Sequence, residues 1–242
     1  MNHIVGADTL EALRSLDTCD VANAIESFDL RLRSEGYTDP TLHCRTPQLP
    51  PMVGYAVTMR IRSSSVPMMG HDYIDRTDWW KQIDSFLLPH VMVIQDMDAH
   101  PGRGAYVGEV HANILKALGF VGVVTNGAVR DLPIVEKIGF NLFSEHVSVS
   151  HGYAHIVNFG APVEVAGLKI KAGDLLHGDQ HGIVRIPLEV AADLPRISAA
   201  VRKREKIITT FCRSNDFSVA GLVQVIRHSA SLVGTEPGQP LH

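Results

Sequence analysis

The chain is poor in cysteine, and this shortage excludes one class of protein. Its 242 residues contain three cysteines, at positions 19, 44 and 212. They form no CxxC pair, and any disulfide scheme leaves one thiol over. A disulfide framework is therefore not expected, and a reducing, cytoplasmic location is predicted.

Long apolar runs and long basic runs are also missing. No apolar stretch approaches the ~18 residues that a membrane span requires. The amino-terminal stretch MNHIVGADTLEALRSLDTCD lacks the charged start and apolar middle of a signal peptide. Lys and Arg number 22 against 26 Asp and Glu, for a formal net charge of -4. We therefore expect neither a membrane partner nor a nucleic-acid partner.

What the chain does contain is an alternation of strand and helix patterns in its middle. PPMVGYAVTMRIRSS, VMVIQD and FVGVVT read as strands, and the last two are the short continuous apolar runs of strands covered on both faces. GEVHANILKALG reads as a helix with an apolar stripe of Val110, Ile114, Leu115 and Leu118, and PIVEKIG as a second helix. This order predicts an α/β fold with a parallel sheet and right-handed crossovers.

The flanks have other patterns. Residues 7–35 are predicted to be helical, with Thr18 or Asp20 as an N-cap. GAPVEVAGLKIKAGDLLHGDQHGIVRIP predicts short antiparallel strands joined by glycine-bearing turns. Helix is predicted again over residues 188–230. The length fits one domain, residues 1–242, with a core of about 50–190.

Two opposite charges stand where a predicted strand meets a predicted helix, in TNGAVRDLPIV. The strand is predicted to end at Gly127, so Arg130 and Asp131 lie at its carboxyl mouth, where open α/β sheets bind ligands. The helix predicted to begin near Glu109 offers N–H groups that suit a carboxylate or phosphate. Arginine grips a carboxylate through two bonds, and aspartate suits magnesium or manganese.

The stretch GEVHANILKALGFVGVVTNGAVRD, with the later GDLLHGDQHGIVRIP, resembles the RraA-like family. That family includes metal-dependent 4-hydroxy-4-methyl-2-oxoglutarate / 4-carboxy-4-hydroxy-2-oxoadipate aldolases and RraA regulators of ribonuclease activity. Its pattern is an acidic residue, twenty intervening residues and Arg-Asp, here Glu109 and Arg130-Asp131. The resemblance covers roughly residues 50–190 and most of the amino-terminal helix. It implies a swivelling β/β/α layered domain with helical ends, assembled as a homotrimer or homohexamer.

The resemblance also implies a role for each matching residue. Arg130 grips the 2-oxo acid, Asp131 binds the Mg²⁺ or Mn²⁺ ion directly, and Glu109 binds it through water. A glutamate from a neighbouring subunit completes the site, and Glu205 is the positional match. The substrate is surrounded by residues at a helix start and by the arginine: Gly108, Glu109, Val110, His111 and Arg130.

Those residue types suit cleavage of a 4-hydroxy-2-oxo acid to pyruvate. The reaction needs removal of the 4-hydroxyl proton and a sink for the electrons that reach C3, which a chelated divalent ion provides. A water on or beside the metal, held by Glu109, is expected to shuttle the proton, so Arg130 and Glu109 are the predicted catalytic residues. Oxaloacetate decarboxylation passes through the same enolate and is expected as well. The alternative function is a non-catalytic, RraA-type regulator that binds a ribonuclease.

Simpler structural interpretations stand beside these roles. Asp131 is also placed to N-cap the helix that Pro133 opens. Arg130 has Glu109 and Glu136 as candidate surface ion-pair partners, and Glu109 complements the dipole of its own helix.

Other residues invite different chemistry. HGDQH suggests a zinc site of His177, Asp179 and His181, but a hairpin turn is favoured. A metal pair of His151 and His155 is disfavoured, as are Schiff-base roles for Lys169 and Lys171, which read as the solvated face of a strand. Residues 65–90 are predicted to be an insertion, and its Trp79 and Trp80 are expected either to pack in a subunit contact or to shape the substrate pocket. His100 and His111 are also expected at the pocket.

Overall fold

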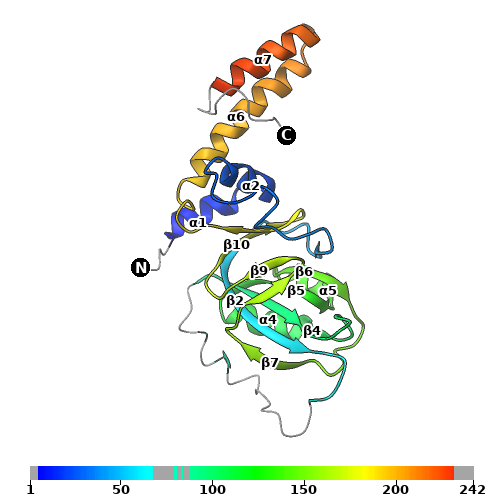
Figure 1. The fold of residues 1–242 in the computed structure, drawn as a ribbon. Helices are drawn as coiled ribbons and strands as arrows, with labels where there is room; N and C mark the ends of the chain where they lie inside the picture. The colour runs from blue at the N-terminus through cyan, green and yellow to red at the C-terminus, as the bar shows by residue number, and fades with distance from the viewer. Residues whose placement is uncertain (1–4, 68–78, 81–82, 84–87, 232–242) are drawn as a thin grey trace.

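The computed structural model describes residues 5–67, 79, 80, 83 and 88–231, and shows a mixed α/β fold (Figure 1). Within the described residues one sheet has nine strands and closes nearly into a barrel, in the order β1-β6-β5-β3-β2-β10-β11, with β4 beside β5 and β7 beside β2. Its strands are β1 (His43–Cys44), β2 (Met52–Arg62), β3 (His90–Asp96), β4 (Ala105–Val107), β5 (Phe120–Val129), β6 (Asn141–Val147), β7 (His155–Phe159), β10 (Leu175–Asp179) and β11 (Gly182–Ile186).

The centre of the sheet has the predicted parallel order. Strands β2, β3, β5 and β6 run parallel to one another, and in the sequence α4 (Glu109–Ala117) lies between β3 and β5, and α5 (Leu132–Lys137) between β5 and β6. Strand β5 continues past Gly127, where the sequence predicted its end, to Val129. The extension follows from β4, which pairs in parallel with Ala128 and Val129 and so prolongs the ladder.

Helix α4 carries the candidate site at its amino terminus. Gly108 takes the N-cap position in an extended conformation, and Gly119, with φ of 87°, ends the helix in the left-handed region that glycine tolerates. Ala112 and Leu115 form its buried face. The prediction was wrong for Val110, which is 70% exposed, because this residue lines an open cavity and not the core.

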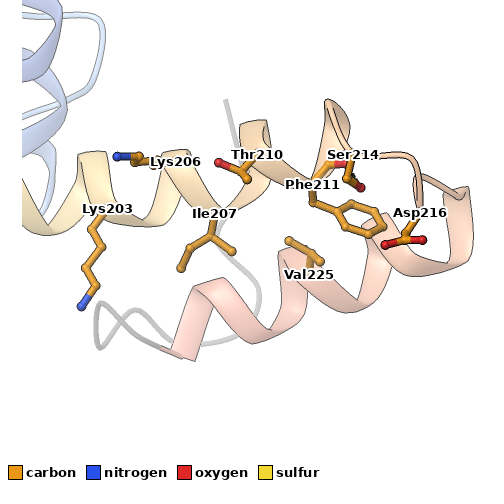
Figure 2. A pocket seen from close by; sticks show the side chains of 8 residues that line it. All are labelled: Lys203, Lys206, Ile207, Thr210, Phe211, Ser214, Asp216 and Val225. Carbon is orange, nitrogen blue, oxygen red and sulfur yellow. Dashed lines mark hydrogen bonds between the residues drawn. The ribbon is translucent and has the colours of Figure 1, made fainter.

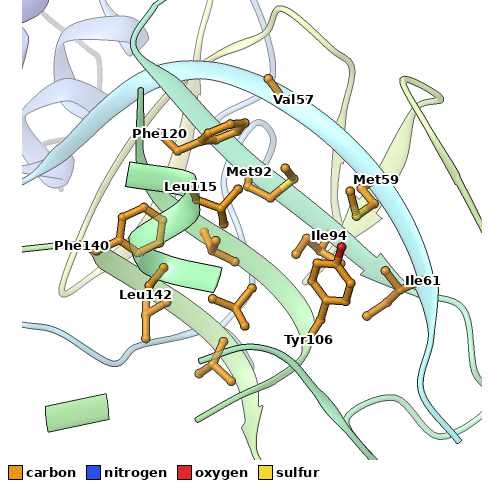
Figure 3. Close-up of a cluster of buried hydrophobic side chains, with 14 of the residues drawn as sticks. Val57, Met59, Ile61, Met92, Ile94, Tyr106, Leu115, Phe120, Phe140 and Leu142 are labelled. Carbon is orange, nitrogen blue, oxygen red and sulfur yellow. The ribbon is translucent and has the colours of Figure 1, made fainter. Parts of the chain in front are cut away.

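The main core lies between the sheet and α4 (Figure 3). Met59 and Ile61 of β2, Met92 of β3 and Leu115 of α4 are each at most 2% exposed. Burial of one such side chain contributes about 1.5–3 kcal/mol. Trp79 belongs to this core, with its ring 6.2 Å from that of Phe120. Trp80 is partly buried against the same core, and the predicted subunit contact or pocket role of the two tryptophans stays a prediction. Most of the 65–90 region lies outside the described residues.

The segment after β6 forms the predicted antiparallel hairpins. Strands β8 (Val163–Val165) and β9 (Leu168–Ile170) pair with each other, and β10 pairs with β11. Strand β10 also lies antiparallel to β2, which bends the sheet toward closure. Tyr55 on β2 is consequently buried in a second packing layer, against the amino-terminal helices.

The amino-terminal helical prediction was too long. Helix α1 spans Ala7–Arg14 and α2 spans Thr18–Glu26, while residues 27–35 are not helical. The N-cap of α2 is Asp17 and not Thr18 or Asp20, because the Asp17 carboxylate accepts the N–H of Asp20 at 2.8 Å.

Two helices end the described chain. Helix α6 (Leu194–Cys212) begins six residues after the predicted start at 188, and α7 (Val219–Ser231) folds back along it, so that the pair stands out from the sheet (Figure 1). Arg202 connects α6 to α2 through ion pairs with Asp17 and Asp20.

A groove of about 560 Å³ lies between α6 and α7. Figure 2 shows this groove, in which Ile207 and Phe211 of α6 face Val225 of α7. Among the described helices, none is long and apolar enough to cross a membrane.

Candidate functional site

Asp131 occupies the N-cap position of α5, but its side chain does not cap that helix. Its backbone is left-handed, with φ of 59° and ψ of 33°, and no N–H of α5 bonds to its carboxylate. Instead Oδ2 accepts the N–H of Glu109, at the start of α4, at 3.0 Å. The carboxylate is therefore directed at the neighbouring helix terminus, and the simple capping interpretation is wrong.

Arg130 lies beside this carboxylate. Its Nε is 3.4 Å from Asp131 Oδ2, and both side chains are 37% exposed. The predicted ion pairs with Glu109 or Glu136 do not form among the described residues. The backbone N–H of Arg130 donates to Val107 O at 3.0 Å, which extends the β4–β5 ladder to the edge where the guanidinium projects.

Gly108 is necessary for this arrangement. A Cβ atom at this position would lie 2.4 Å from Asp131 Oδ2 and 2.8 Å from Arg130 Cγ. Because the backbone is extended here, the constraint is space and not conformation. The missing side chain lets the carboxylate and the guanidinium reach the amino terminus of α4.

A cavity of about 370 Å³ opens at this point. Five of its lining residues are those predicted around a substrate, and three were not predicted; together they are Gly108, Glu109, Val110, His111, Arg130, Ala105, Tyr106 and His151. Asp131 lies beside the cavity, in contact with Glu109 and Arg130. The rings of Tyr106 and His111 stack with centroids 5.0 Å apart and planes 24° apart. His100, the other histidine expected here, is exposed and is not among the lining residues.

His151 is one of the three lining residues that the sequence did not predict around the substrate. It belongs to the loop between β6 and β7, and its Nδ1 lies 2.9 Å from the carbonyl oxygen of Gly152. His155, considered with it as a metal pair, lies on β7 with Nδ1 2.8 Å from Tyr153 O and is not a cavity residue. The usable signal was a histidine-glycine pair in a polar loop after a parallel strand, at the same sheet edge as Arg130.

A buried polar network supports the loop beneath the cavity. The carboxylate of Asp96, which is 2% exposed, accepts the hydroxyl of Ser63 at 2.8 Å and the N–H of Gly102 at 3.0 Å. Burial raises the pKa of Asp98, but the N–H groups of Ser63 and Ser64, each at 2.8 Å from Oδ2, outweigh it and hold the pKa below its usual value. This network fixes the segment that precedes β4.

The donor set around Asp131 suits a hard divalent cation. Both of its contacts fall on Oδ2, so Oδ1 has no hydrogen-bond partner within the part of the chain that the structure describes. A carboxylate oxygen with solvent beside it is the kind of ligand that magnesium and manganese take, with waters in their other positions. Among the described residues there is no group of three His, Cys, Asp or Glu that would enclose a metal. Asp131 with waters is thus the set that the chain offers.

Glu205 lies apart from this set. It is exposed on α6, which packs on α2 and α7, and α6 leaves the body on the side of the amino-terminal helices (Figure 1). A contribution from a neighbouring subunit remains a prediction.

The HGDQH segment serves structure, as the hairpin interpretation predicted. His177 is fully buried on β10, with Nδ1 3.0 Å from Thr18 Oγ1 and Nε2 3.1 Å from Leu13 O. Asp179 accepts the N–H groups of Thr18 and His181, each at 2.8 Å. Both ring nitrogens of His177 are occupied, so His177 and Asp179 tie α1 and α2 to the hairpin instead of binding zinc, and His181 bonds to Asp179 within the turn. Lys169 and Lys171 are exposed, as expected of a solvated strand face.

A family model matches most of this chain. The family model described as RraA-like, Aldolase/RraA, matches residues 18–185. A Halalkalibacterium halodurans protein named "Putative 4-hydroxy-4-methyl-2-oxoglutarate aldolase" is 31% identical over 84 residues, which are 34% of this chain and 40% of that protein. Protein DlpA of Legionella pneumophila is 26% identical over 92 residues, 37% of this chain and 15% of that protein. The matches thus span less than half of either relative.

Solved structures show the same fold. An uncharacterized protein from Pseudomonas syringae pv. tomato superimposes with a TM-score of 0.69 at 22% identity, over 93% of this chain and 95% of that one. Streptomyces coelicolor RraAS2, described as an unusual member of the RNase ES inhibitor RraA protein family, gives 0.63 at 17% identity, over 84% and 96%. At these identities the likeness concerns the fold.

Proposed function

The chain belongs to the RraA-like family, and on that basis we propose that it is a divalent-metal-dependent lyase that cleaves a 4-hydroxy-2-oxo acid to pyruvate. One observation carries the proposal. The Asp131 carboxylate, with one oxygen left for a ligand, stands beside the Arg130 guanidinium and the first N–H of α4, at the edge of a cavity of about 370 Å³.

The chain's own residues supply binding and charge. The Arg130 guanidinium suits two parallel bonds to a carboxylate and adds fixed positive charge where negative charge develops on the 2-oxo oxygen. The amino terminus of α4 contributes its positive dipole end on the same side. Glu109, exposed at the cavity, is placed to hold a water molecule. When bound at Asp131, a Mg²⁺ or Mn²⁺ ion would supply the electron sink.

The same arrangement supports a second reaction of the same class. Loss of carbon dioxide from oxaloacetate leaves its electron pair at C3, just as cleavage of the C3–C4 bond of a 4-hydroxy-2-oxo acid does. Stabilisation of that negative charge by Arg130 serves both reactions. We therefore include oxaloacetate decarboxylation in the proposed activity.

Two features of assembly and location belong to the proposal as well. The resemblance implies a homotrimer or homohexamer whose sites lie at subunit borders, with Glu205 reaching a neighbour's site. It also fits a cytoplasmic enzyme, since the three cysteines are unpaired.

The test is a coupled assay of pyruvate release. Oxaloacetate and a panel of 4-hydroxy-2-oxo acids with different groups at C4 are supplied with Mg²⁺, with Mn²⁺ and with excess chelator. We expect pyruvate from oxaloacetate and from at least one hydroxy acid, lost with chelator and restored by metal. Absence of pyruvate across the panel would reject the lyase and favour the alternative, a regulator that binds a ribonuclease, which needs no such carboxylate and guanidinium pair.

A further inference from the structure

The proposed cleavage needs a group that takes the proton of the 4-hydroxyl. A guanidinium has no acceptor lone pair, so Arg130 cannot do this. Asp131 Oδ2 already accepts the N–H of Glu109 and faces Arg130 Nε. The cavity contains two further groups of the type most often used for proton transfer, the imidazoles of His111 and His151.

The hydrogen bond of His151 determines which of its nitrogens is an acceptor. Gly152 O lies 2.9 Å from Nδ1, and a carbonyl oxygen only accepts, so Nδ1 carries the hydrogen of the neutral ring. Nε2 therefore holds the lone pair. Nε2 has no hydrogen-bond partner among the described residues. Its lone pair can accept a hydrogen bond from a hydroxyl group, whereas a carboxylate has no hydrogen to donate.

The backbone that carries His151 is held in place. Ala105 N donates to Ser150 O at 2.9 Å, and Tyr153 N donates to Ser63 O at 3.1 Å. A Cβ atom at Gly104 would lie 2.4 Å from His151 O, so the loop lies directly against the segment that begins β4. Because Ser63 also bonds to the buried Asp96, the loop is tied to the network beneath the cavity.

His111 is differently placed. Its ring stacks on Tyr106 with 5.0 Å between centroids, so one face is covered by the cavity wall, and it lies in the first turn of α4 next to Glu109. This position suits packing around a ligand. His151 comes from the loop after β6, on a different segment from Arg130 and Asp131, and lines the cavity from that element.

We propose that His151 is the catalytic base that takes the 4-hydroxyl proton, an inference that rests on the proposed function. The hydroxyl hydrogen moves to Nε2 while the C3–C4 bond breaks. The C4 oxygen becomes a carbonyl oxygen, and the bonding electron pair becomes the enolate of pyruvate. The imidazolium then releases its proton to solvent, and C3 takes a proton from solvent. Atoms and charge balance without a further reactant.

Decarboxylation of oxaloacetate provides an internal control, because that reaction has no hydroxyl proton to remove. We expect His151→Gln to lower cleavage of the hydroxy acid that the wild type cleaves fastest by ~10²–10⁴-fold. The same variant should retain oxaloacetate decarboxylation, since Arg130 and Asp131 are unchanged. Glutamine keeps a polar side chain of related reach but does not take up a proton at neutral pH.

His155→Gln is the matched control. Its imidazole makes the same kind of bond, from Nδ1 to a backbone carbonyl at 2.8 Å, but lies outside the cavity lining. It should retain both reactions, and His111→Gln should not reproduce the selective loss.

The remaining outcomes overturn the assignment. An equal loss of both reactions in His151→Gln would indicate a structural role, and retention of both would exclude His151 as the base. A selective loss of cleavage in His111→Gln instead would transfer the role to that residue. If the wild type releases pyruvate from neither substrate class, the proposed function fails, and the assignment of His151 fails with it. If the wild type releases pyruvate and His151→Gln has wild-type activity, only the assignment of His151 as the base is rejected.

Discussion

Asp131 has an uncommon backbone for a residue with a side chain. At φ of 59° it lies in the left-handed region, which costs a non-glycine residue roughly 1–2 kcal/mol. Asp and Asn bear this cost better than most residues because their short polar side chains form local bonds. The conformation turns the carboxylate away from α5 and toward α4, and the bond from Glu109 N offsets part of the strain. Strain of this kind at the edge of a cavity is typical of functional sites.

We expect Asp131→Asn to lose metal-dependent pyruvate release while the protein stays folded. Asparagine tolerates the left-handed backbone and still accepts from Glu109 N, but it carries no charge for a cation. Activity and Mn²⁺ binding by calorimetry, measured on the same preparation, check this. Asp29→Asn is the control, since Asp29 is exposed and also has a positive φ, of 51°. Wild-type Mn²⁺ affinity in Asp131→Asn would refute the metal assignment.

We expect Arg130→Lys to lower pyruvate release by ~10²–10³-fold, the usual cost of losing one well-placed donor to developing charge. An ammonium group keeps the charge but not the two-pronged geometry. Steady-state kinetics measure the effect, which should appear in kcat as well as in KM. Arg196→Lys, an exposed arginine paired with Asp193, should change neither constant. Near-normal turnover of Arg130→Lys would count against its role as the oxo-acid clamp.

Among the helices and strands, the contact between β4, α4 and β5 decides whether the site exists. The sequence alone predicts that the start of α4 and the end of the strand FVGVVT lie at one edge of the sheet, but it predicts no strand between them. Strand β4 pairs with the end of β5, so that Gly108 lies against Arg130 and Asp131. The motif residues are thus brought together by a three-residue strand, which is too short for a periodic pattern to reveal.

The contact between the amino-terminal helices and the β10–β11 hairpin should make the stability of the protein depend on pH. Burial lowers the pKa of His177 from its ordinary 6.5, and the Leu13 carbonyl, Asp179 and Asp17 only partly oppose this. When the pH falls below 6.5, His177 takes up a proton in the unfolded chain but stays neutral in the folded chain, so the free energy of unfolding falls as the pH decreases. The pKa of Asp179 is lowered, because bonds from Thr18 and His181 outweigh burial, and its stabilisation is lost only at more acid pH.

We therefore expect the wild type to lose stability between about pH 7 and pH 5.5 as His177 takes up its proton in the unfolded state. His177→Gln should be less stable at pH 8 but show a flatter dependence in this window. Denaturant unfolding at a series of pH values measures both. His181→Gln, at an exposed neighbour, should retain the wild-type slope. An unchanged slope in His177→Gln would exclude His177 as its source.

For the molecule as a whole, the question is whether one chain completes its own site. Helix α6 carries Glu205 and projects from the body with α7 (Figure 1). Asp131 keeps one carboxylate oxygen without a hydrogen bond among the described residues, and a cation bound there would take its further ligands from water or from another subunit.

Mixed oligomers test this sharing. Asp131→Asn and Glu205→Ala are each expected to be inactive alone, whereas co-expressed subunits should regain roughly a quarter of the wild-type rate, because about one site in four combines both native residues in a closed homo-oligomer. Light scattering of the wild type should give the mass of a trimer or hexamer. Full activity of Glu205→Ala, or no recovery in an assembled mixture, would exclude Glu205 as the shared ligand.

The local patterns were sufficient for much of this protein. Alternating apolar runs and helical stripes predicted the parallel centre, and glycine turns predicted the antiparallel hairpins, because burial and turn geometry act over a few residues. The spacing of Glu109 and Arg130-Asp131 led to the family and to five of the cavity residues. Helix extents were less certain, since propensity did not reveal that α2 stops at Glu26.

Other features depended on contacts between distant segments. The pairing of β4 with β5 brings Gly108 against Arg130 and Asp131, and the pairing of β6 with β5 brings the loop that carries His151 to the same cavity. Such pairings are selected by the packing of the entire sheet, in which each strand's position depends on all the others, and no short stretch of residues carries that information. Composition and spacing specify what each segment tends to form, while the closing of the sheet selects which side chains meet.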